Sequence, residues 1–139
     1  MQRLARAKKS AASGERLVKS GVLAKTEAEQ RALRAIRLES ELANAQVLAA
    51  QAQVALQETR SAAHQASQSD LDAALEALAR ASAAAQTAGE NYHKAQLDAA
   101  ALNLRRQRQL LALGSGHRSD VARAEEKLDR LQRGDAPPQ

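Results

Sequence analysis

The sequence contains no cysteine, phenylalanine or tryptophan, and only one tyrosine and one methionine among 139 residues. Without cysteine the chain can form no disulfide, no thiolate zinc site and no thiol nucleophile. Aromatic side chains usually dominate the energetics of a globular core, so we do not expect a thick core. The residue types that favour strands are also scarce, which argues against a β-sandwich or a barrel.

Long apolar runs are absent as well. Leucine, isoleucine and valine are dispersed and never form the run of about 18 apolar residues that a membrane-spanning helix needs. The first residues carry the positive charges of a signal peptide, but no apolar stretch follows them. We therefore expect a cytoplasmic protein, or a periplasmic one if the sequence is part of a larger exported chain.

The residues that are present favour helices. Alanine occupies 34 positions, and leucine, arginine, glutamine, glutamate and lysine fill most of the others. All of these are strong helix formers, and their abundance is typical of coiled coils and long helices.

Glycines and hydroxyl residues mark the predicted breaks between helices. Gly21 and Gly114 are each placed to end a helix in the left-handed conformation. Five residues after each glycine, Thr26 and Ser119 precede an acidic residue, so we predict that they cap the next helices. A third break, near Ser69, resembles a capping box that Asp72 completes.

These breaks predict an all-α fold with helices at residues 2–20, 26–66, 70–112 and 119–133, and a disordered tail at 134–139. The two middle helices have similar lengths, which favours an antiparallel hairpin, a single elongated domain over residues 1–133. The short flanking helices would fold back at one end, where both glycine turns would lie. The alternative is one long helical rod with ordinary amphipathicity.

Alanine-rich stripes with heptad spacing support helix pairing. The second helix carries two of them, which would let it contact two neighbours, including other copies of the chain. The first consists of Leu33, Ile36, Ser40, Ala43, Val47, Ala50 and Val54, and the second of Leu38, Leu42, Ala45, Ala49, Ala52 and Leu56. The third helix shows Ala74, Leu78, Ala81, Ala85, Ala88, Tyr92, Ala95, Ala99 and Leu102, and the last shows Val121, Ala124, Leu128 and Leu131.

The two glycine turns form an internal repeat. An apolar anchor, a glycine, a hydroxyl residue and an acid recur at the same offsets, first from Leu17 and then from Leu110. The segment 16–29 resembles the coiled-coil tip of HlyD-like membrane fusion proteins, which are periplasmic adaptors. The segment 113–125 resembles the periplasmic tip of TolC-like outer-membrane factors.

This resemblance implies a non-enzymatic helical hairpin of a tripartite efflux or type I secretion system, docking tip to tip with the helices of an export channel. The implied docking residues are Arg16, Leu17, Gly21, Thr26, Arg106, Leu110, Gly114 and Ser119. Adaptor tips usually carry an arginine, a leucine four residues later and a serine seven residues after that. The first turn has Ser13, Leu17 and Ala24 there, and the second has Arg106, Leu110 and His117, so neither copy is complete.

Catalytic and metal-binding patterns are not recognisable. His64, His93 and His117 are far apart in sequence and form no ligand pair. We find no nucleophile elbow and no phosphate-binding glycine loop. We therefore expect no enzyme activity, no metal and no cofactor.

Charge supports an alternative function. The net charge is +5, made up of +6 over residues 1–40, −4 over 41–100 and +3 over 101–139. A cytoplasmic coiled-coil scaffold or a nucleic-acid-associated protein could use such basic ends. The lack of stacking aromatic residues counts against nucleic acid as the partner.

Overall fold

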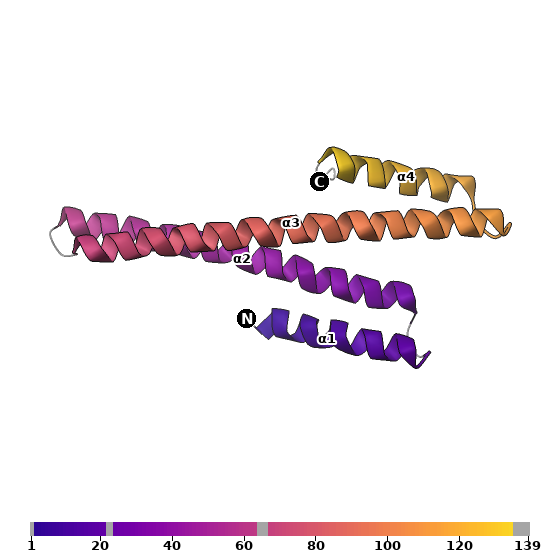
Figure 1. The fold of residues 1–139 in the computed structure, drawn as a ribbon, viewed down its shortest axis with the longest axis horizontal. Helices are drawn as coiled ribbons and strands as arrows, with labels where there is room; N and C mark the ends of the chain where they lie inside the picture. Colours follow the sequence, from indigo (N-terminus) through magenta and orange to yellow (C-terminus); the bar gives the residue numbers. More distant parts are fainter. Residues whose placement is uncertain (1, 22–23, 64–66, 135–139) are drawn as a thin grey trace. The chain divides into compact units, whose positions relative to one another are not determined.

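The computed structural model describes residues 2–21, 24–63 and 67–134. In this part of the chain every regular element is an α-helix: α1 (Gln2–Lys19), α2 (Lys25–Ala62), α3 (Gln68–Ala112) and α4 (Arg118–Arg133) (Figure 1). The prediction of an all-α fold is therefore confirmed, and each helix begins and ends within four residues of its predicted bounds. The high helix propensity of alanine, leucine and the long polar residues explains this agreement.

Two compact units divide the chain, Met1–Asn91 and Tyr92–Gln139. The first contains α1, α2 and the beginning of α3, and the second contains the rest of α3 and α4. The single hairpin over residues 1–133 stays a prediction.

In the first unit α1 packs against α2 (Figure 1). A Cβ atom placed on the buried Gly14 would lie 3.6 Å from the Cα atom of Ala28 and 3.5 Å from the Cδ atom of Arg31. Further along, the Nζ atom of Lys8 lies 2.5 Å from Oε1 of Glu39. Because lower numbers on α1 meet higher numbers on α2, the two helices are antiparallel, and a methyl group at position 14 would fit between them at ordinary contact distance.

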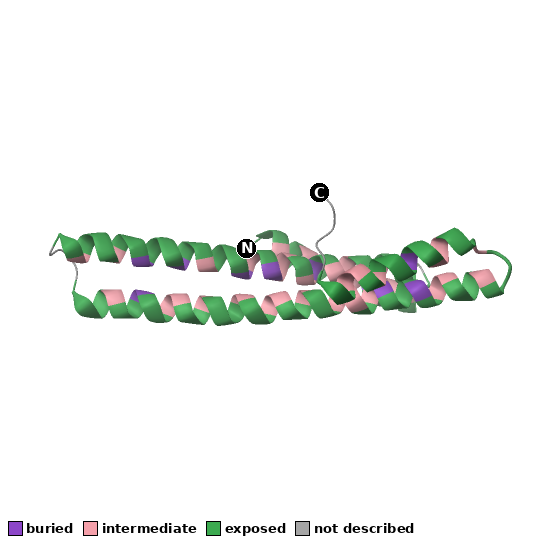
Figure 2. Ribbon diagram, turned by 90° about the horizontal axis from the view of Figure 1, so that it is seen from above, coloured by how far each residue is buried: buried purple, intermediate pink, exposed green. Residues whose placement is uncertain are grey.

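The packing between helices is thin. Among the described residues no side chain is less than 2% exposed, and most buried positions are alanines, seen as isolated purple positions in Figure 2. Burying one methyl group contributes only about 0.8 kcal/mol. The fold therefore depends on the length of its contacts rather than on a few large side chains.

The first predicted stripe of α2 matches the buried side of that helix. Ser40, Ala43, Ala50 and Val54 are buried, and the remaining stripe residues are half-buried. The stripe of α3 behaves in the same way except at its end, where Leu102 is 38% exposed. The heptad pattern thus identifies most of the inner positions, whereas the buried Ala35, Ala100 and Leu104 lie outside the predicted stripes.

The second stripe of α2 is only partly covered. Leu38 and Leu42 are half-buried, whereas the four stripe residues from Ala45 to Leu56 are exposed. Since Lys8 lies opposite Glu39, the first residue of α1 comes opposite about residue 45 of α2. The stripe therefore continues beyond the reach of α1.

The predicted hydroxyl caps are wrong for two helices. Ala24 and His117 hold the cap positions of α2 and α4 in extended conformation, and neither makes a side-chain cap hydrogen bond. The carbonyl of Ala24 accepts the first intrahelical bonds of α2, so Thr26 lies inside its first turn. The carbonyl of His117 accepts the first intrahelical bonds of α4, so Ser119 lies inside the first turn of that helix. Each earlier start adds backbone hydrogen bonds to the helix, which outweighs a cap worth about 1 kcal/mol.

The capping box at the third break exists, two residues before its predicted place. The backbone N–H of Asp70 donates to Oγ of Ser67 at 3.3 Å, and the backbone N–H of Ser67 donates to Oδ2 of Asp70 at 3.1 Å. Gly134, predicted to open the disordered tail, instead ends α4 in the left-handed conformation, with φ 74°. The rest of the tail, residues 135–139, lies outside the described residues, as does His64.

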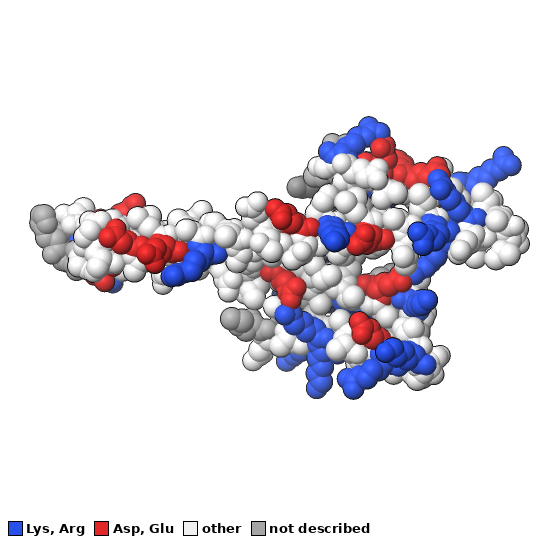
Figure 3. Space-filling view, in the orientation of Figure 1, with Lys and Arg blue, Asp and Glu red and all other residues white. Residues whose placement is uncertain are grey.

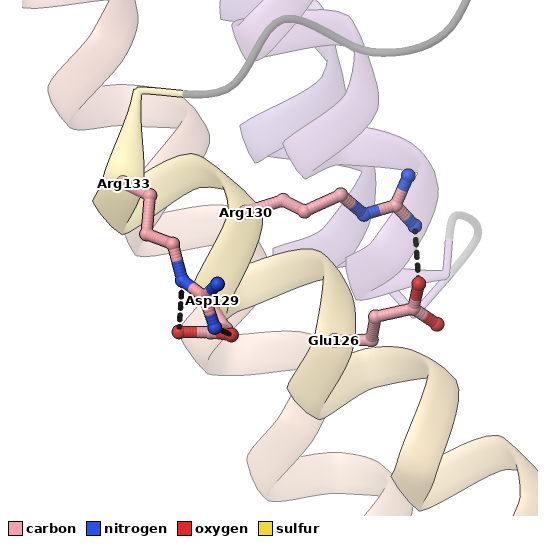
Figure 4. A network of polar contacts seen from close by, with 4 residues as sticks. All are labelled: Glu126, Asp129, Arg130 and Arg133. Atoms are coloured by element: carbon pink, nitrogen blue, oxygen red, sulfur yellow. Dashed lines mark hydrogen bonds and ion pairs between the residues drawn. The ribbon is translucent and has the colours of Figure 1, made fainter.

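In the second unit α4 folds back along the last turns of α3 (Figure 1). The guanidinium of Arg108 donates to Oε1 of Glu125 at 2.7 Å, and Leu104 and Leu128 line one groove. Other ion pairs stay within α4, where Glu126 meets Arg130 and Asp129 meets Arg133 (Figure 4). Such local pairs support the helix itself and are independent of its position on α3.

Candidate functional site

The two glycine turns are the candidate docking sites, and they share one backbone geometry. Gly21 and Gly114 have φ angles of 74° and 73°, so both end their helices in the left-handed region as predicted. The N–H of Gly21 donates to the carbonyl of Val18, and the N–H of Gly114 donates to that of Leu111, both at 3.0 Å. Both turns therefore share the helix-ending geometry that is common where a helix ends at a glycine.

The second turn is tightly closed around the carbonyl of Leu110. This oxygen accepts the N–H of Ser115 and of Gly116, each at 3.0 Å, and the hydroxyl of Ser115 at 3.3 Å. With the bond from Gly114 to Leu111, this is a Schellman motif. The turn is thus held by its own backbone and needs no side chain from α4.

Gly116 has a separate role that the sequence analysis missed. A Cβ atom there would lie 2.7 Å from the backbone nitrogen of Leu111 and 2.9 Å from the carbonyl carbon of Leu110. Any side chain would force backbone atoms apart. The signal was available in the sequence, as a second glycine two residues after a helix-ending one.

The predicted docking residues differ in accessibility. Arg16 is exposed and Leu17 is half-buried in the last turns of α1, while Leu110 is 41% exposed near the end of α3. Arg106 is half-buried, one turn before Leu110. Arg106 and Leu110 lie on one face of α3, because consecutive helical turns bring residues four apart together, whereas the adjacent Arg16 and Leu17 point about 100° apart around α1.

Leu113 is the most exposed large apolar side chain among the described residues, at 79%. It directly precedes Gly114, so the Schellman motif fixes its backbone. The sequence analysis did not single it out as a docking residue. Leu113 and Leu110 give this turn an exposed apolar end.

A shallow groove of about 420 Å³ lies between α3 and α4. Its lining residues are Ala101, Leu104, Arg105, Arg108, Gln109, Ala112 and Leu128. The floor is apolar and the polar groups are arginines and one amide, so this lining offers neither a nucleophile nor a general base. The groove can contact a partner side chain but supplies no chemistry for a reaction.

One carboxyl group at the α2–α3 turn has a shifted pKa. The pKa of Asp70 is lowered because its carboxylate accepts hydrogen bonds from the hydroxyl and the backbone N–H of Ser67. His93 and His117 are exposed. In the described ranges no three histidine, aspartate or glutamate residues are grouped as metal ligands would be, and no helix is long and apolar enough to cross a membrane.

Comparison with known proteins finds no matching family model, no matching curated protein and no matching solved structure.

Proposed function

We propose that this chain is a non-enzymatic interaction protein that docks through its glycine turns onto the helical tips of a partner. The observation that carries the proposal is the α3–α4 turn, where Leu113 and Leu110 are exposed on a backbone closed by hydrogen bonds. A backbone that is already fixed loses little entropy when a partner covers its side chains. Such a turn is suited to end-on contact.

The proposed architecture is an antiparallel hairpin of α2 and α3. The burial of Ala50 and Val54 on α2 and of Ala74 on α3 supports it, because α1 reaches only to about residue 45 of α2. All three residues belong to the first unit. Pairing of α2 with the start of α3 accounts for their burial.

The resemblance of the two turns to export-system tips identifies the proposed partner class. The partner would be a periplasmic adaptor or an outer-membrane channel with helical tips, and the chain would act in the periplasm as part of an exported protein. Further copies would pack side by side through the alanine and leucine stripes. The exposed part of the second α2 stripe, from Ala45 to Leu56, supports this side-by-side contact.

Distance measurements test the hairpin directly. Because the chain has no cysteine, the variants Ser20→Cys and Ser115→Cys can each carry one spin label. A hairpin brings the labels within about 40 Å. A chain that does not double back separates them by more than about 100 Å, because α2 and α3 contain 38 and 45 residues. A spectrum without short distances would rule out the hairpin.

Capture of the partner tests the docking turn. Leu113→Glu should abolish co-purification of an export protein with helical tips, because it places a charge in the contact. Leu75→Glu is the matched control, since Leu75 is also exposed, at 46%, and lies on the same helix. Equal recovery with both variants, or recovery of no export protein by the unmodified chain, would contradict the proposal.

A further inference from the structure

The outer face of α1 concentrates positive charge. This helix carries six lysine and arginine residues and one acid, Glu15. All six basic residues are exposed. Figure 3 shows lysine and arginine side chains along the edge of the molecule where α1 lies. One short helix therefore holds an excess of charge equal to that of the whole chain.

Most of this charge is not neutralised within the protein. Lys8 pairs with Glu39 across the α1–α2 contact. Within the part of the chain that the structure describes, the other five basic residues have no ion-pair or hydrogen-bond partner. These are Arg3, Arg6, Lys9, Arg16 and Lys19. In contrast, α4 pairs Arg123, Arg130 and Arg133 with acids of its own.

The opposite face of α1 is already occupied. Gly14 is buried against Ala28, and the neighbouring residues Ala7, Ala11 and Val18 are half-buried. An amphipathic helix binds a bilayer by burying its apolar face. The apolar face of α1 is packed on α2, so membrane insertion is disfavoured and only the charges remain available.

The basic residues of α1 are distributed around the helix axis as well as along it. At about 100° per residue, the four basic residues from Arg6 to Lys19 that lack partners spread over about 140° of the circumference and about 20 Å of length. A flat anionic surface meets only the middle of such a spread closely. Phosphates on both sides of a duplex groove, which is wide enough to admit a helix, can meet its two flanks as well.

We propose that the outer face of α1 binds the phosphate backbone of duplex nucleic acid without sequence preference. Charge neutralisation and counterion release supply essentially all of the affinity in binding of this kind, so the absence of aromatic residues is no obstacle. The surface belongs to the first unit, and the docking turn at Leu113 belongs to the second. The two surfaces are therefore separate, and binding of a duplex at α1 is tested independently of the partner that the turn contacts.

Fluorescence anisotropy with a duplex of about 30 base pairs and arbitrary sequence tests this surface. If four phosphates are neutralised, the logarithm of the association constant should fall against the logarithm of salt concentration with a slope of about −3.6. The affinity should therefore drop about 150-fold between about 50 and 200 mM salt. No binding at the lower salt concentration would overturn the proposal.

Two sets of variants with the same change in net charge locate the surface. The first set neutralises the α1 face with Arg6→Gln, Lys9→Gln, Arg16→Gln and Lys19→Gln. The control set neutralises α4 with Arg118→Gln, Arg123→Gln, Lys127→Gln and Arg133→Gln. The α1 set should lose at least 100-fold in affinity at about 50 mM salt while the control set loses less than about fivefold. Equal losses would mean that net charge alone is responsible, and the assignment to α1 would fail.

Three further measurements test the role of the head group, the folding of the variants and the membrane alternative. Arg6→Lys with Arg16→Lys should retain binding, because a backbone contact needs charge rather than a particular head group. The helicity of every variant is checked by circular dichroism. Vesicles with about 30% phosphatidylserine should bind more weakly than the duplex at equal salt, and tighter binding to the vesicles would replace nucleic acid by a lipid surface as the partner.

Discussion

The substitution Gly14→Ala adds one methyl group between α1 and α2 and so tests how these helices pack. Replacing it by alanine removes the entropic cost of an interior glycine, which contributes about 1 kcal/mol of stability. The new Cβ would lie 3.5–3.6 Å from three atoms of Arg31 and Ala28, at ordinary contact distance. Each such contact adds about 0.1–0.2 kcal/mol. We therefore expect Gly14→Ala to raise the free energy of unfolding by slightly more than 1 kcal/mol.

Three further substitutions separate packing from helix propensity. Gly89→Ala gains only the propensity, because a Cβ there would meet nothing within 4 Å. Gly14→Leu should be less stable than Gly14→Ala by about 1–3 kcal/mol, because the larger side chain must separate the two helices. Ala12→Leu, on the exposed face of the same helix, should change stability by less than about 0.5 kcal/mol.

Urea unfolding followed by circular dichroism at 222 nm measures these differences, and hydrogen exchange of the α1 amides shows whether they are local. A gain of 1 kcal/mol corresponds to about 3–5 °C in the midpoint of thermal unfolding for a chain of this size. If Gly14→Leu were as stable as Ala12→Leu, α1 would not pack against α2 at this point, and the antiparallel contact would be refuted.

Three further predictions concern the turns and the second unit. Gly116→Ala should lower the free energy of unfolding by about 1–3 kcal/mol, measured by urea titration, because its Cβ would overlap backbone atoms; an unchanged midpoint would contradict the close approach. Ser67→Ala should lower the free energy of unfolding by about 1 kcal/mol through loss of the cap. The pKa of Asp70 is lowered in the folded protein, so its ionised carboxylate contributes to the free energy of unfolding. This contribution is complete above the unfolded pKa of 3.8 and is lost as the pH falls through the lower folded pKa. A titration of helicity from pH 6 to 2 should show this loss in the unmodified chain and not in Ser67→Ala. Arg108→Ala and Glu125→Ala should give a coupling of about 0.2–1 kcal/mol in a double-mutant cycle that decreases in about 1 M salt, and a coupling near zero in low salt would argue against the contact of α4 with α3.

Local signals in the sequence predicted the helices and their ends. The alanine-rich composition and the positions of Gly21 and Gly114 determine where helices run and where the backbone turns left-handed, and both effects act within a few residues. The first α2 stripe was also predictable, because heptad spacing defines one face of a helix without knowledge of its neighbour.

Features that depend on register between helices were not predictable. The pair Lys8–Glu39 exists because α1 lies antiparallel on α2 at one particular offset, and this pair alone distinguishes Lys8 from the other basic residues of α1. The exposure of Leu113 depends in the same way on how α4 leaves the turn. Ala24 holds the N-cap position of α2 instead of the predicted Thr26, because a hydroxyl cap contributes only about 1 kcal/mol to stability.

The ion pairs within α4 have a consequence for the unfolded chain. Asp120–Arg123, Glu126–Arg130 and Asp129–Arg133 join residues three or four apart, so together they stabilise an isolated helix by about 1 kcal/mol. We therefore expect this segment to keep part of its helicity after its tertiary contacts are lost. Residual structure at the C-terminal end of the denatured chain should then lower the urea m-value below that expected from a fully extended reference.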